Sequence, residues 1–198
     1  MKQILNLAMN IFLRLNYLVD FMLKLKFIIY LFDSLSCAIG KSFAWCILIL
    51  IFGTCYEVFM RYVFNNPTAW SFDMSFILYG TIFMMAGAYT LSKGEHVRGD
   101  FLYRKWKPKN QARIDLVLYF LFFFPGILAM MISGFEYGIA SSILAEVSVN
   151  SPAGVPIWPL KMIIFFSGIF LFIQGISEVI RCFVCIKEGE WPSREYIE

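Results

Sequence analysis

Two cysteines three residues apart, Cys182 and Cys185, have the spacing in this sequence best suited to chemistry. A C-x-x-C pair can form a reversible disulfide, the working group of thiol oxidoreductases. The pair ends a long apolar run beside basic residues, on the side that we assign below to the cytoplasm, where thiols stay reduced. The sequence therefore favours two small packing side chains, and a membrane thiol oxidoreductase is the alternative.

A carboxylate inside an apolar stretch is the second candidate for chemistry. Glu57 precedes Arg61 by four residues, which is the favourable order for an ion pair on a helix. An intramembrane acid can also couple proton or substrate movement, so a self-sufficient small four-helix transporter using Glu57 is a further alternative. Because Arg61 lies within a turn of the predicted helix end, we favour an ion pair that neutralises itself near the membrane interface.

The remaining polar residues give no positive sign of catalysis. His96 is the only histidine, so a bis-histidine haem or a histidine-based metal cluster is not supported. Glu136 and Glu146 could attract a cation, but a solvated position is favoured by the Ser-, Gly- and Ala-rich segment around them. The sequence predicts no enzyme, cofactor or metal, and a net charge of +3 is too weak to indicate nucleic acid.

The elements around these residues are those of an all-α integral membrane protein. Of the 198 residues, 60% are hydrophobic and 16% are charged, whereas soluble domains are about 45–50% apolar. Long apolar runs predict four transmembrane helices, because about 20 apolar residues span a hydrocarbon core of roughly 30 Å. The expected spans are 43–64, 70–91, 114–135 and 157–180.

The basic residues predict the orientation of these helices. All but Arg61 and Lys161 of the 17 Lys and Arg residues lie before the first span, between the second and third spans, or after the fourth. Cytoplasmic loops carry such an excess, so both termini are expected in the cytoplasm.

The first 41 residues are predicted to form an amphipathic lead on the cytoplasmic face of the membrane. Its polar residues fall on one stripe at helical spacing, whereas most of the others are large and apolar. The stripe consists of Gln3, Asn6, Asn10, Arg14, Asp20 and Lys24. A fifth, half-embedded helix is the alternative. The chain thus divides into a lead (1–41), a four-helix transmembrane domain (42–186) and a cytoplasmic tail (187–198).

Two sequence clusters resemble a known family. The first reads Arg61-Tyr-Val-Phe-Asn-Asn-Pro-Thr-Ala-Trp70 followed by Ser71-Phe-Asp73, and the second reads Gly94-Glu-His-Val-Arg-Gly-Asp100. With the four-helix plan, they resemble the small membrane subunit of TRAP transporters, the DctQ-type family. The segment 151–161 and the pair Gln174-Gly175 resemble one branch of it. This sequence departs from the family in holding Phe72 and Asp73 where two adjacent Glu are common, and Gly99 where a branched apolar residue is usual.

The resemblance implies a role in transport in a bacterial inner membrane. Such systems import carboxylate-bearing solutes with the sodium gradient. A periplasmic binding protein delivers the solute, and a large multispanning subunit carries it beside a small subunit that widens its scaffold. We expect structural or inter-subunit contacts from Arg61, Trp70, Asp73, His96, Arg98 and Asp100, and close helix packing from Gly80, Ala86, Gly87 and Ala88.

Overall fold

The computed structural model describes residues 2–95, 103 and 105–194, and this part of the chain is helical, with no strand. The elements in chain order are the α-helices α1 (Lys2–Ala44), α2 (Cys46–Val63), α3 (Ser71–Lys93) and α5 (Pro108–Leu118), the π-helical turn η1 (Tyr119–Phe123), and the α-helices α6 (Phe124–Ile143) and α7 (Trp158–Glu188). Four stretches are long and apolar enough to cross a membrane, as predicted: Val19–Val63, Ser71–Lys93, Pro108–Ile143 and Trp158–Glu188.

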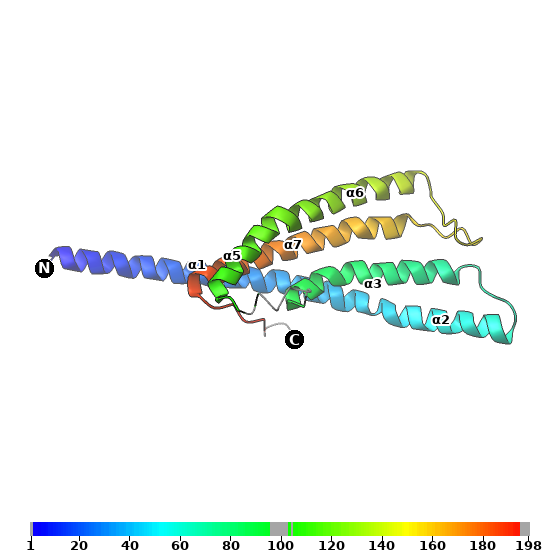
Figure 1. Ribbon diagram of the computed structural model, residues 1–198, viewed down its shortest axis with the longest axis horizontal. Coiled ribbons are helices and arrows are strands. Elements are labelled where there is room, and N and C mark those ends of the chain that lie inside the picture. The colour runs from blue at the N-terminus through cyan, green and yellow to red at the C-terminus, as the bar shows by residue number, and fades with distance from the viewer. Residues whose placement is uncertain (1, 96–102, 104, 195–198) are drawn as a thin grey trace.

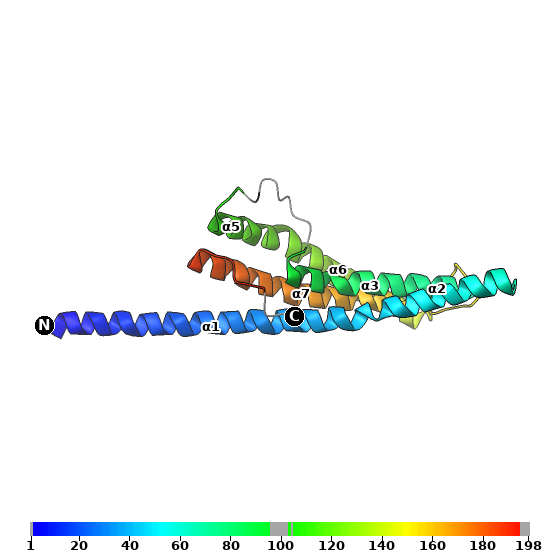
Figure 2. The same ribbon diagram turned by 90° about the horizontal axis from the view of Figure 1, so that it is seen from below.

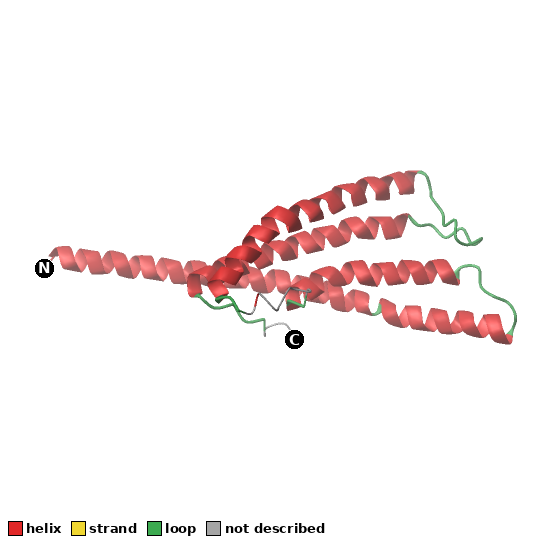
Figure 3. Ribbon diagram, in the orientation of Figure 1, coloured by secondary structure: helices red, strands yellow, loops and turns green. Residues whose placement is uncertain are grey.

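The spanning helices form two antiparallel hairpins, α2 with α3 and α6 with α7 (Figure 1). Helices α3 and α7 contact each other and join the hairpins, while α1 lies against both of them. We call the end that holds residues 64–70 and 144–157 the hairpin end. The opposite end, which holds the C-terminal segment and the start of α5, is called the terminal end. Figure 3 shows the two loops that connect the helices at the hairpin end, of which the α6–α7 loop is the longer.

The third and fourth spanning helices run further than expected. The third spanning stretch covers 108–143 rather than 114–135, and α7 continues to Glu188 rather than ending near residue 180. The expected ends were placed where charges begin, but a charge ends an apolar run without ending a helix. Arg181 continues α7 because its side chain is buried against partners from other segments.

A proline inside the third spanning stretch explains its π-helical turn. Pro125 stands in the first turn of α6, directly after η1. Proline has no backbone N–H and clashes with the carbonyl of the preceding turn, so an α-helix must widen or bend there. The wider π-helical turn accommodates this defect, and Figure 1 shows the third stretch curving between α5 and α6.

Helix α1 continues directly into α2. Only Trp45 interrupts the helix, and the two helices follow nearly the same axis (Figure 2). No break appears at residues 41–42, where the lead was expected to give way to the first span. The first part of α1 projects beyond the other helices, whereas its second half packs on α3 and α7.

Glycines let the helices approach closely. A Cβ built at Gly134 of α6 would lie 3.0 Å from the backbone nitrogen of Phe165, and one at Gly138 would lie 2.4 Å from the sulfur of Met162. Small residues four apart allow this kind of contact between membrane helices. Two glycines of the second span, Gly80 and Gly87 of α3, were expected to allow close helix packing. Both lie against leucines of α7.

Candidate functional site

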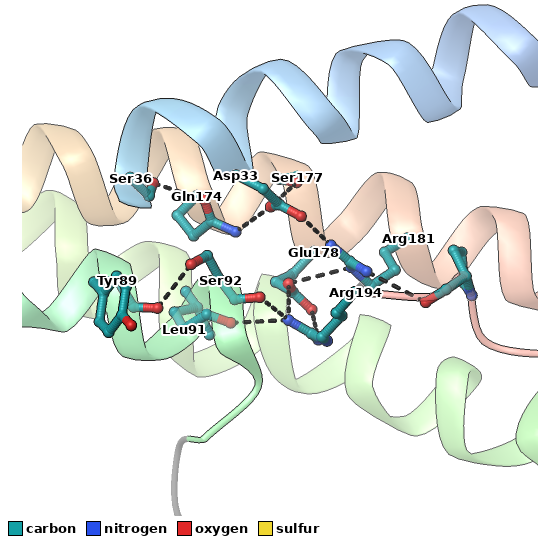
Figure 4. A network of polar contacts seen from close by, with 11 residues as sticks. Asp33, Ser36, Tyr89, Leu91, Ser92, Gln174, Ser177, Glu178, Arg181 and Arg194 are labelled. Carbon is teal, nitrogen blue, oxygen red and sulfur yellow. Dashed lines mark hydrogen bonds and ion pairs between the residues drawn. The ribbon is translucent and has the colours of Figure 1, made fainter. Parts of the chain in front are cut away.

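A buried cluster of polar side chains connects α1 to α7 at the terminal end (Figure 4). Asp33 of α1 is 2% exposed, and its carboxylate faces α7. Its Oδ1 accepts hydrogen bonds from the Gln174 amide at 2.7 Å and from the Ser177 hydroxyl at 2.9 Å. Its Oδ2 accepts a hydrogen bond from the Arg181 guanidinium. Ser36, one turn further along α1, donates to the Gln174 carbonyl oxygen at 2.7 Å, so the amide is held at both ends.

The cluster extends from α7 into the C-terminal segment. Glu178 of α7 is 1% exposed and lies 3.4 Å from the Nε of Arg181. Arg194 lies at the end of the described chain, and its guanidinium donates two hydrogen bonds to the Glu178 carboxylate, of 2.9 and 2.7 Å. A bidentate Arg–carboxylate pair is strong and fixes the geometry of both side chains. Arg194 thereby attaches the C-terminal segment to the helices.

Arg194 also closes the end of α3. The last carbonyls of a helix have no partner within the helix, and a cation beside them is favourable. Arg194 donates to the carbonyl oxygens of Leu91 and Ser92. The αL residue that ends α3 is Gly94, with φ of 72°, as a C-terminal glycine should be. A Cβ at Gly94 would lie 3.0 Å from the Arg194 guanidinium. Glycine is therefore favoured here both by the left-handed backbone conformation and by the close approach of Arg194.

The cluster is electrically balanced. Two carboxylates, Asp33 and Glu178, face two guanidiniums, Arg181 and Arg194. Burying charges is costly unless they are paired and hydrogen-bonded. We therefore regard these four residues, with Ser36, Gln174 and Ser177, as one unit and call it the terminal-end network.

A second set of contacts closes the loop between α2 and α3. Glu57 is an acceptor for Arg61, with a distance of 3.0 Å from Nε to Oε1. The other carboxylate oxygen of Glu57 accepts the Thr68 backbone N–H at 2.9 Å and also the Thr68 hydroxyl. Trp70, at the start of α3, stacks on Tyr56 with ring centroids 6.2 Å apart. Glu57 thus holds the loop in place at the hairpin end.

Asp73 fixes the other loop at the hairpin end. It is 4% exposed in the first turn of α3. Its carboxylate accepts hydrogen bonds from the Ser148 hydroxyl at 2.6 Å and from the Ser151 hydroxyl. The loop is further held by the backbone hydrogen bond from Ser148 to Val155 at 2.8 Å. Asp73 therefore ties the α6–α7 loop to the α2–α3 hairpin.

A third contact at this end involves Glu146 and Lys161. The Lys161 ammonium donates to Glu146 and lies 3.8 Å from the centre of the Tyr137 ring, a cation–π contact. The hydrogen bond from Lys161 holds the pKa of Glu146 below its ordinary value of 4.5. Glu146 is thus engaged within the chain, whereas Glu136 is exposed on α6.

Residues 50–185 match the model of the family described as tripartite ATP-independent periplasmic transporters, DctQ component. This match covers more than half of the chain. The chain belongs to this family. A comparison with curated protein sequences gives no match.

The matched region includes only part of the terminal-end network of this DctQ component. Gln174, Glu178 and Arg181 lie inside it, whereas Asp33 and Arg194 lie outside. The network thus joins two segments outside the matched region, α1 up to Ala44 and the C-terminal segment, to α7 inside it.

The structure places the predicted site residues at different locations. Arg61, Trp70 and Asp73 all lie at the hairpin end, where Arg61 bonds Glu57, Trp70 stacks on Tyr56 and Asp73 bonds the α6–α7 loop. His96, Arg98 and Asp100 lie outside the described residues. The sequence reading missed the terminal-end network because Asp33 was assigned to the lead and Arg181 to the segment just after the fourth span. The available signal was the run Gln174, Ser177, Glu178 and Arg181, which places polar residues on one face of an otherwise apolar helix.

The cysteine pair is buried in this DctQ component. Cys182 is 1% exposed and Cys185 is fully buried, and both pack against Ala112 of α5. Neither cysteine forms a disulfide, and Cys185 approaches the carbonyl oxygen of Pro108 at 3.6 Å. A thiol that exchanges with a substrate must be accessible, so this geometry favours the packing interpretation. Among the described residues, no group of His, Cys, Asp and Glu could hold a metal ion.

Proposed function

We propose that this chain is the small membrane subunit that scaffolds the large transport subunit of a TRAP transporter. The complex would take up a carboxylate-type solute, coupled to sodium and delivered by a periplasmic binding protein. The family supports the transporter component itself. The coupling ion, the solute and the scaffolding role are parts of our proposal.

The observation that carries the scaffolding role is how the buried acids are used. In the described residues the buried carboxylates are Asp33, Asp73 and Glu178. Each one is bonded to basic or hydroxyl groups that tie one segment of this chain to another. A coupling acid in a transporter must instead release its partners during the cycle. These acids fasten the structure, as a fixed scaffold requires.

We further propose that the chain lies in the bacterial inner membrane with both termini in the cytoplasm. The terminal end then faces the cytoplasm, and the hairpin end faces the periplasm and the binding protein. The polar residues between Gln3 and Lys24, which the sequence predicts to share one stripe, support contact with the cytoplasmic membrane surface. Because α1 runs nearly straight to Ala44 (Figure 2), such contact requires the helix to tilt or bend.

Reconstitution in liposomes tests the scaffolding role. The large subunit, this chain and the binding protein should together accumulate a labelled carboxylate solute under an inward sodium gradient. Leaving out this chain should abolish accumulation, and this chain alone should give none. Uptake by the large subunit and the binding protein without this chain would contradict the proposal.

The same assay separates the alternative mechanisms. Uptake by this chain alone, lost in Glu57→Gln, would support a self-sufficient transporter. Replacing both Cys182 and Cys185 by Ser should leave uptake by the complete assembly unchanged, and its loss would point to thiol chemistry.

A further inference from the structure

The outward face of the first spanning stretch carries a lysine and a tryptophan one helical turn apart. Lys41 of α1 is exposed, and its ammonium has no hydrogen-bond or ion-pair partner among the described residues. Trp45 follows four residues later, and 70% of its surface is exposed. Phe52 continues the same face and is 72% exposed. This surface, which we call the Lys41 face, points away from the other helices.

The depth of these residues follows from the Tyr56–Trp70 stack. Tyr and Trp gather at membrane interfaces, and this pair lies beside the loop at the hairpin end, so it marks that interface. At about 1.5 Å per residue, Trp45 lies about 16 Å and Lys41 about 22 Å from this level. In a hydrocarbon core of roughly 30 Å, the indole is then near the centre and Lys41 is about 8 Å inside the far boundary. On this scale the first span begins before residue 43, where the sequence prediction placed it, as the longer apolar stretch Val19–Val63 allows.

Both positions are unfavourable in contact with lipid. Trp prefers the interface, where its N–H can find a partner, and a charged side chain inside the core is costly. Lysine can extend toward the headgroups and lower this cost. Even if Lys41 extends to the headgroups in this way, the exposed indole of Trp45 still lies at the centre of the core without a partner for its N–H among the described residues.

The helix is irregular at the same place. Trp45 separates α1 from α2, and the Leu48 N–H bonds to the Trp45 carbonyl at 3.1 Å, a shorter-range bond than the α-helical one. Ser42 donates its hydroxyl to the Ala38 carbonyl at 2.8 Å, a contact that often bends helices. The break lies before residue 50, outside the region that matches the family.

A groove of about 380 Å³ adjoins the Lys41 face toward the hairpin end. It runs between α2 and α3 and is lined mainly by apolar side chains, with Phe52 and Gly53 on one wall and Met74 on the other. A Cβ added at Gly53 would meet nothing within 4 Å. Another membrane helix could therefore place a large apolar side chain here beside the exposed indole.

We propose that the Lys41 face docks the large transport subunit through one of its membrane helices. That helix would offer a carboxylate, or the free carbonyls of a helix end, to the Lys41 ammonium, and an apolar pocket with a hydrogen-bond acceptor to the Trp45 indole. Charge complementarity favours this partner over lipid tails, which offer no acceptor at this depth. The inference rests on the proposed function, because it assumes that the large subunit is present.

Co-purification from membranes provides the first test. The wild-type chain should bring the large subunit with it, and Lys41→Met and Trp45→Ala should each lower its recovery about tenfold, as loss of a paired charge or an aromatic anchor does. Lys41→Arg should retain it. The matched controls are Lys105→Met, an exposed lysine near the start of α5, and Phe122→Ala, a 67% exposed aromatic on η1. Both controls should bind like the wild type.

Photocrosslinking gives a second readout that does not depend on the stability of the variants. A photoreactive residue at position 45 should form an adduct with the large subunit, and one at position 122 should not. Three outcomes would overturn the proposal, provided that the wild-type complex is recovered. They are adducts only at position 122, adducts with a second copy of this chain, and no protein adduct at position 45. If the wild-type chain recovers no large subunit, the proposed function fails as well.

Discussion

At the residue scale, the charges of this chain are used to join segments that are distant in sequence. Asp33 and Arg181 link α1 to α7, Glu178 and Arg194 link α7 to the C-terminal segment, and Asp73 links α3 to a loop. In an apolar environment each link is strong only while both partners are present, because one partner alone is a buried, uncompensated charge.

Replacing Asp33 by Ala should therefore destabilise the protein severely. The substitution leaves the Arg181 guanidinium without its main partner and the donors of Gln174 and Ser177 without an acceptor. We expect a loss of about 3–5 kcal/mol, the usual cost of breaking a buried pair. The free energy of unfolding in mixed micelles measures it.

The exposed ion pair of the same helix provides the control. Asp20 and Lys24 lie 2.7 Å apart with side chains 61% and 71% exposed. Asp20→Ala should cost less than about 1 kcal/mol. Equal losses in Asp20→Ala and Asp33→Ala would mean that the terminal-end network contributes nothing beyond a surface pair.

The Glu146–Lys161 contact should make stability depend on pH. The pKa of Glu146 is lowered in the folded protein, so its contribution is fully present above the ordinary value of 4.5 and is lost as the pH falls through the lowered value. The melting temperature of the wild type should exceed that of Glu146→Gln at pH 7, and the gap should narrow below about pH 4.5. A gap that stays constant down to pH 3 would contradict this assignment.

Sequence reasoning found part of this residue-scale pattern. Glu57 and Arg61 are close in the chain, so their spacing alone indicated contact. Asp33 and Arg181 belong to opposite ends of the chain, and no local pattern connects them. Their pairing depends on α1 continuing straight past α7, which the periodicity of the first residues does not reveal.

At the element scale, close packing of α6 on α7 depends on glycine. The sequence predicted where apolar helices occur, because length and composition suffice for that. It did not single out Gly134 and Gly138 or the π-helical turn before Pro125, because these depend on which faces meet.

Adding one methyl group at Gly134 should separate these helices. The new Cβ of Gly134→Ala would meet the backbone nitrogen of Phe165 at 3.0 Å, and backbone cannot rotate away. We expect a loss of about 1–3 kcal/mol, as in other overpacked contacts. Gly126→Ala is the matched control on the same helix, since its Cβ would meet nothing within 4 Å. That variant should be neutral or gain up to about 1 kcal/mol from helix propensity. Similar losses in both variants would rule out a specific contact.

At the scale of the whole molecule, the structure separates two kinds of end. The hairpin end is closed by two loops held by Glu57 and Asp73. The terminal end gathers the C-terminal segment, the start of α5 and most of the basic residues. The positions of the basic residues along the sequence predicted this asymmetry, and the antiparallel hairpins bring those segments to one end.

The asymmetry predicts how the chain is oriented. Basic residues remain on the cytoplasmic side during insertion, so a fluorescent protein fused after Glu198 should fluoresce, because it folds in the cytoplasm. Alkaline phosphatase fused at the same place should be inactive, whereas fusions within the hairpin-end loops at Asn66 or Asn150 should be active. Among the described residues, Arg61 and Lys161 are the only basic ones at the hairpin end, and both are paired with glutamates. Adding lysines beside Asn150 should therefore reduce phosphatase activity there by retaining the loop inside. An active phosphatase after Glu198 would show that the orientation is the opposite one, with the terminal-end network at the periplasmic face.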